Sequence, residues 1–145
     1  MSDTRTATEI AAANRELARK FLIGELGFEL FADDVVLEFP YGPSLGMPDR
    51  FEGKEVAVTY LTQMLSQLQD LQMRDVVSHS VDADPNTVIN EYEGDAVTKS
   101  GKAYTQIYMN KMRFRDGKLV LFRELWDPMR VAASTDGAYE GNVTA

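Results

Sequence analysis

Apolar residues near the start of the chain recur at helical spacing. They lie three or four positions apart, at Ile10, Ala13, Leu17 and Phe21. This spacing predicts an amphipathic helix with one apolar face. The segment Thr6-Ala7-Thr8-Glu9 has the spacing of a capping box, so the helix should begin there, and Gly24 should end it.

The next segments predict a strand, a long loop and a second helix. Residues 35–39 (VVLEF) are rich in β-branched and aromatic side chains, as strands are. Three of the five prolines fall in residues 40–48, which favours a loop. Residues 54–68 return to helical spacing, with Tyr60 and Met64 in one apolar row.

From residue 71 onward the apolar pattern changes to a period of two. Turn-forming residues divide this half into four predicted strands, at 72–81, 87–98, 102–114 and 118–127. Consecutive strands joined by short turns pair antiparallel, so we expect a curved meander with the helices covering one face. The fold class is α+β, in one domain over residues 1–134 followed by a loose tail over 135–145.

The last hairpin has two possible registers. A two-residue turn at Asp116-Gly117 places Glu124 opposite Met109. A three-residue loop over residues 115–117 places Glu124 opposite Tyr108 instead. In this second register one face of the hairpin collects Gln106, Tyr108, Asn110, Met112, Phe114, Val120, Phe122, Glu124 and Trp126.

Glu124 is the candidate catalytic residue of this face. Phe122 and Trp126 flank it and its own face carries no cation, so its ionised form would be destabilised and its pKa should rise. Such a carboxyl group suits general acid or base catalysis near neutral pH. Periodicity alone favours the alternative, in which Glu124 points outward and pairs with a lysine or arginine.

The opposite face of the hairpin is also apolar, with Ile107, Met109, Leu119, Leu121 and Leu125. A sheet that is apolar on both faces needs two covers, and the helices supply one. A second subunit would supply the other, which predicts a homodimer. The alternative is that residues 129–133 fold back over this face.

Composition and charge exclude several kinds of partner. Against 15 basic residues stand 23 acidic ones, and the net charge of -8 repels nucleic acid and anionic membranes. The chain has no cysteine and one histidine, His79, so we expect no metal site and no cofactor. It also lacks a signal-peptide core and any apolar run of about 18 residues, which predicts a cytoplasmic protein.

The order of the elements resembles the nuclear transport factor 2-like superfamily, which includes SnoaL-like cyclases and ketosteroid isomerase. The similarity spans roughly residues 9–133 and rests on FADDV (31–35), EGKE (52–55) and a meander that contains Asp116-Gly117-Lys118. It implies a cone-shaped, curved antiparallel sheet that wraps around the N-terminal helices and encloses a pocket.

The C-terminal half resembles the phenazine-biosynthesis PhzA/PhzB proteins, from YTQIY (104–108) to RELWDP (123–128). In that family a glutamate at the position of Glu124 acts as acid and base, and a tyrosine at the position of Tyr104 lines the pocket. The resemblance thus favours an inward Glu124 and the three-residue hairpin loop. A pocket histidine and a pocket serine of the family are replaced by Tyr60 and Met64, which argues against the phenazine condensation itself.

Together these features predict a cofactor-independent acid/base enzyme that isomerises, cyclises or condenses a small cyclic, largely apolar metabolite. Glu124 would be catalytic. The expected substrate contacts are Tyr104, Tyr108, Tyr60, Met64, Gln106, Phe122, Trp126, Glu38 and Tyr92. The alternative is a non-catalytic small-molecule-binding or dimeric accessory module, because one fold can host both.

Overall fold

The computed structural model describes residues 3–135, and its first helix, α1 (Ala7–Leu22), begins at the predicted capping box. The hydroxyl of Thr6 accepts a hydrogen bond from the Glu9 backbone N–H at 3.1 Å, and the Glu9 carboxylate accepts one from the Thr6 N–H at 3.3 Å. These bonds satisfy two backbone donors that the helix start would otherwise leave free. The predicted start of the helix is confirmed.

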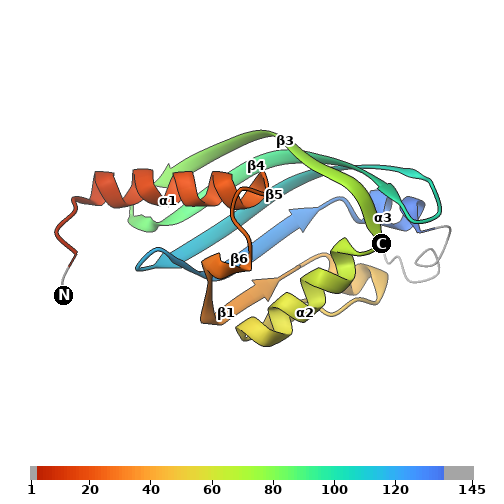
Figure 1. Cartoon of the computed structure of the whole chain (residues 1–145), viewed down its shortest axis with the longest axis horizontal. Helices are drawn as coiled ribbons and strands as arrows, with labels where there is room; N and C mark the ends of the chain where they lie inside the picture. Colours follow the sequence, from red (N-terminus) through yellow and green to blue (C-terminus); the bar gives the residue numbers. More distant parts are fainter. Residues whose placement is uncertain (1–2, 136–145) are drawn as a thin grey trace.

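Six strands form one curved mixed sheet in the order β2-β1-β6-β5-β4-β3 (Figure 1). Their bounds are β1 Phe31–Glu38, β2 Arg50–Glu52, β3 Leu68–Val81, β4 Asp84–Thr98, β5 Ala103–Arg115 and β6 Lys118–Trp126. Strands β3 to β6 form the predicted antiparallel meander, and β1 joins β6 in parallel. The α+β class and the cone-like curvature are confirmed.

Strand pairing accounts for the boundaries that the sequence pattern placed elsewhere. Helix α2 (Lys54–Leu65) ends before Leu68, because Leu68 pairs with Thr98 and starts β3. Strand β1 starts at Phe31, which pairs with Leu119 of β6. Residues 50–52, which follow the predicted loop, form β2, a strand that the pattern did not predict.

The last hairpin follows neither predicted register along its whole length. Its turn is the two-residue one, with positive φ at Asp116 (50°) and Gly117 (76°), so the favoured three-residue loop is wrong. The register then shifts by one residue on β6, and Glu124 lies opposite Asn110. The two-residue turn puts Leu119 opposite the buried Phe114, on the face predicted for Val120, and the later shift keeps Phe122, Glu124 and Trp126 on the predicted face.

The helices cover the concave face of the sheet. Helix α1 packs on β3 and β4, and α2 packs on β1, so the two helices lie over different strands of the sheet (Figure 1). A short third helix, α3 (Pro128–Ser134), lies against β5 and the 3₁₀ turn Gly42–Leu45. Two short 3₁₀ turns, Phe28–Leu30 and Gly42–Leu45, connect these elements.

The convex face of the sheet keeps exposed apolar side chains. Ile107 is 52% exposed and Met109 is 45% exposed. The alternative in which residues 129–133 cover this face is wrong, because Val131 of α3 faces the cavity on the concave side. Of the predicted tail, all residues after Thr135 lie outside the described part of the chain. Within residues 3–135, no helix is long and apolar enough to cross a membrane.

Candidate active site

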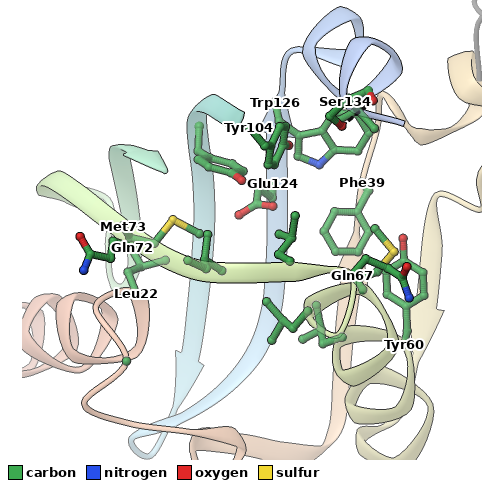
Figure 2. A pocket seen from close by; sticks show the side chains of 18 of the residues that line it. Leu22, Phe39, Tyr60, Gln67, Gln72, Met73, Tyr104, Glu124, Trp126 and Ser134 are labelled. Atoms are coloured by element: carbon green, nitrogen blue, oxygen red, sulfur yellow. Dashed lines mark hydrogen bonds between the residues drawn. The ribbon is translucent and has the colours of Figure 1, made fainter. Parts of the chain in front are cut away.

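A cavity of about 1130 Å³ lies between the concave face of the sheet and the three helices. Its walls are mainly apolar and come from the end of α1, from α2, α3 and from strands β3, β5 and β6 (Figure 2). Polar and exposed residues such as Gln67, Lys99 and Ser100 form part of its lining where α2 meets the β4–β5 turn. This combination suits a ligand that is mostly apolar.

Glu124 projects from β6 into this cavity (Figure 2). Among residues 3–135, it is the one carboxyl-bearing residue in the cavity wall. Its neighbours on the same face of β6, Phe122 and Trp126, are 5% and 8% exposed and also line the cavity. Glu124 itself is partly accessible, and the cavity provides that access.

Tyr92 of β4 contacts the Glu124 carboxyl group on the side away from the cavity. Its hydroxyl donates a hydrogen bond to Oε2 of Glu124, and Asn110 of β5 donates to the same hydroxyl oxygen at 3.0 Å. The Tyr92 ring stacks on Tyr108, with centroids 4.9 Å apart and planes 12° from parallel. Tyr92 is 2% exposed and does not line the cavity, so it supports Glu124 rather than contacting a ligand there.

Burial raises the pKa of Glu124 from its ordinary value of 4.5 to about 7, and the hydrogen bond from Tyr92 partly opposes the rise. The nearest guanidinium along the chain, that of Arg123, lies on the convex face and pairs with Glu38 at 3.4 Å. Burial also raises the pKa values of Tyr92, Tyr104 and Tyr108 above the ordinary value for a phenol. Near neutral pH the carboxyl group can therefore both give and take a proton.

Most of the predicted contacts line the cavity. They are Tyr104, Tyr108, Tyr60, Met64, Phe122 and Trp126. The Tyr60 ring stacks on Phe51, with centroids 3.9 Å apart, and forms one wall together with Phe39. Tyr108 lies over Gly94, where an added Cβ would come within 2.9 Å of its ring. The lack of a side chain at Gly94 therefore gives Tyr108 its position.

Besides Tyr92, two further predicted contacts do not line the cavity. Gln106 is 1% exposed and sits behind the wall, where its Nε2 donates to the Tyr104 hydroxyl and to the Asp127 carbonyl, each at 3.0 Å. Glu38 does not line the cavity, because it pairs with Arg50 at 3.0 Å. The strand alternation of β1, with Leu37 and Phe39 buried, turns Glu38 toward the other face.

The sequence interpretation missed the partners behind Glu124. Strand alternation placed Asn110 on its face, but both predicted registers set a different residue opposite Glu124. Placing Asn110 opposite Glu124 requires the one-residue register shift in β6, which the sequence pattern does not indicate. No three histidine, cysteine, aspartate or glutamate side chains in the described residues gather as a metal site would require.

The fold and the cavity on its concave face are those of a nuclear transport factor 2-like protein. The family profile of the SnoaL-like domain matches residues 11–122, and the chain belongs to this family. An uncharacterised PhzA/B-like protein from Pseudomonas aeruginosa is 38% identical over 103 residues, which cover 70% of this chain and 71% of the relative.

Two solved structures have closely similar folds. A Bacillus subtilis protein named "Putative Isomerase" superposes with a TM-score of 0.78 and 30% identity, covering 92% of this chain and 97% of its own. A phenazine biosynthesis-related protein from Pseudomonas aeruginosa superposes with a TM-score of 0.77 and 19% identity, covering 94% of this chain and 89% of its own. At that identity the second similarity supports the fold alone.

The raised pKa of Glu124 predicts a specific dependence of stability on pH. Because the folded state holds this proton more tightly than the unfolded state, the contribution favours folding below pH 4.5 and is lost as the pH rises to about 7. Wild type should lose up to roughly 3 kcal/mol relative to Glu124→Gln over this range, at about 1.4 kcal/mol per pKa unit. Urea unfolding of both proteins from pH 4 to 8 measures the difference.

Glu55→Gln is the control for the loss of one carboxylate, because Glu55 is exposed at the start of α2. A difference between wild type and Glu124→Gln that stays constant with pH would contradict a buried, proton-retaining Glu124.

Proposed function

We propose that this protein is a cofactor-independent acid/base enzyme that isomerises, cyclises or condenses a small cyclic, largely apolar metabolite. The observation that carries the proposal is a single carboxyl group, Glu124, with a pKa of about 7 in the wall of an apolar cavity. Tuning a glutamate to this range is typical of a general acid or base. Family membership and the 30% identical protein named as an isomerase support the same class of reaction.

The proposed chemistry needs one proton carrier. In its ionised form, Glu124 takes a proton from a carbon atom next to a ring carbonyl. In its neutral form it returns that proton to the resulting enolate at another atom. The hydroxyl groups of Tyr104 and Tyr108 line the same cavity, and phenols of this kind can donate hydrogen bonds to the ligand oxygen.

The second candidate function is non-catalytic binding of the same class of ligand. The replacement of a family histidine and serine by Tyr60 and Met64 leaves the α2 wall without a side chain that titrates near neutral pH. The stacked rings of Tyr60 and Phe51 suit contact with a flat ligand ring, whether or not that ligand reacts. Proton transfer distinguishes the two functions, because only the enzyme exchanges a carbon-bound proton.

Hydrogen–deuterium exchange into cyclic and fused-ring ketones tests the proposal. In D₂O, wild type should accelerate exchange beside the carbonyl, with a rate that rises as Glu124 ionises through about pH 7. Glu124→Gln should slow this exchange by about 10²–10⁴-fold, the usual contribution of a general acid or base. NMR of the ketone measures the exchange, and Trp126 fluorescence measures binding separately.

Glu38→Gln is the matched control, because it changes a carboxyl group outside the cavity and should leave the exchange rate unchanged. Binding reported by Trp126 without any accelerated exchange would favour the binding module over the enzyme.

We further propose that the convex face pairs with a second copy of the chain. Val77, Ile107 and Met109 are 49%, 52% and 45% exposed and surround a shallow depression together with Leu125. Contiguous exposed apolar patches mark sites of protein–protein contact. A two-fold axis across this face would bury the patch of each subunit against the other.

Light scattering at micromolar concentration should therefore give twice the mass of the chain. Ile107→Arg should shift the protein toward monomer, because it would bury an unpaired charge in the interface. Val56→Arg changes an apolar side chain of similar exposure (50%) on α2, far from the patch, and should leave the mass unchanged. A wild-type monomer would contradict this assembly.

A further inference from the structure

A row of polar side chains crosses the concave face of the sheet and ends at Glu124. Ser78 of β3 pairs with Asn90 of β4, Asn90 pairs with Asn110 of β5, and Asn110 pairs with Glu124 of β6. We call Ser78, Asn90 and Asn110 the polar row. Asn90 is fully buried and Asn110 is 2% exposed, although rows of mostly apolar residues flank them. Burial of two amides requires a complete set of hydrogen bonds.

The hydrogen bonds of the polar row all run in one direction. The Ser78 hydroxyl donates to Oδ1 of Asn90 at 2.5 Å, and Nδ2 of Asn90 donates to Oδ1 of Asn110 at 2.7 Å. Nδ2 of Asn110 then donates to the Tyr92 hydroxyl at 3.0 Å. That hydroxyl in turn donates to Oε2 of Glu124.

A thioether at the centre of the polar row indicates the direction of its hydrogen bonds. Nδ2 of Asn90 also lies 3.4 Å from the sulfur of Met112, which is fully buried. A thioether sulfur only accepts hydrogen bonds, so it favours the amide nitrogen over the amide oxygen at this position. With Asn90 oriented, Asn110 must present its nitrogen to Tyr92, and the proton of the Tyr92 hydroxyl is left for Glu124.

We propose that the polar row positions the acid/base group: through Tyr92 it commits Oε2 of Glu124 to accepting a hydrogen bond, so that Oε1 carries the transferable proton. Within residues 3–135, Oε1 accepts no hydrogen bond, which leaves it available to a ligand in the cavity. Asn110, Asn90 and Ser78 thus act through Tyr92 and do not touch the ligand. The proposal rests on the acid/base role of Glu124 and adds which oxygen performs it.

This arrangement has a chemical advantage for a group that both gives and takes protons. When Glu124 loses its proton from Oε1, the bond from Tyr92 to Oε2 remains and steadies the new carboxylate. When a proton returns, it returns to the oxygen that faces the ligand. Donors aligned in one direction also polarise one another, which strengthens the last bond of the series.

The polar row can be tested in the wild-type protein without a ligand. The side-chain amide ¹H–¹⁵N signals of Asn110 and Asn90 should shift with pH at one shared midpoint, that of Glu124, near 7. The amide of Asn14 is an internal control, because it is 3% exposed but bonds to the Pro85 carbonyl and Asn86, away from Glu124. Asn110 and Asn90 signals that stay flat while Glu124 titrates would overturn the proposal.

Other titratable groups do not produce this signal. The phenols that face Glu124 are those of Tyr92 on β4 and of Tyr104 and Tyr108 on β5, and burial raises all three pKa values away from the tested range. Lys99 contributes to the cavity lining from the β4–β5 turn. His79 follows Ser78 in the chain, but its Nε2 contacts Glu91 at 2.8 Å, so the shared midpoint should persist in His79→Gln.

A double-mutant cycle tests the route through Tyr92. Tyr92→Phe removes the last donor and should raise the pKa of Glu124 above about 7, while the Asn110 and Asn90 signals stop following it. Asn110→Leu should also raise the pKa of Glu124 in wild type, but by less or not at all in the Tyr92→Phe background. Asn14→Leu, the same loss of a buried amide elsewhere, should leave that pKa unchanged.

Equal effects of Asn110→Leu in both backgrounds would contradict the positioning role and indicate a general change in polarity. If Asn110→Leu does not fold, the wild-type titration and Tyr92→Phe still decide the matter. Neither measurement uses turnover. If the Asn110 and Asn90 signals follow Glu124 but the protein does not accelerate proton exchange in the ketone, only the enzymatic function is overturned. If the protein accelerates that exchange but the two amide signals do not follow Glu124, only the role of the polar row is overturned.

Discussion

The candidate site is built around the burial of one carboxyl group, that of Glu124, at the wall of an apolar cavity. A carboxylate removed from water is costly, and without a cation beside it the neutral form becomes competitive near pH 7. Tyr92 limits the cost through one hydrogen bond, and the stacking of Tyr92 on Tyr108 holds that donor in place. Because desolvation outweighs the hydrogen bond from Tyr92, Glu124 lowers the stability of the fold near neutral pH and is suited to act as an acid or base.

The geometry of the sheet provides this environment. The curvature leaves room between α1 and α2, and Gly94 lets the ring of Tyr108 lie close to the strand. Alternation along β6 then sends Arg123 to the convex face and Glu124 to the cavity, so the two opposite charges are kept apart. The convex face, with Ile107 and Met109 exposed, is left as the surface for the proposed subunit contact.

Much of this could be predicted from the sequence. Helical spacing and the capping box gave the start of α1, and the change to a period of two gave the four-strand meander. The position of Glu124 depended on the resemblance, because a charged residue in a strand is more often solvated. The polar row could not be predicted, because it requires the register across four strands, and one irregularity in β6 moves Asn110 opposite Glu124.

Burial in the cavity wall keeps Glu124 protonated well above its ordinary pKa of 4.5. A ¹³C NMR titration of its carboxyl carbon in the wild-type protein, assigned by comparison with Glu124→Gln, measures this directly. The titration midpoint should lie near pH 7. A midpoint near the ordinary value of 4.5 would show that Glu124 is solvated and would overturn its proposed role.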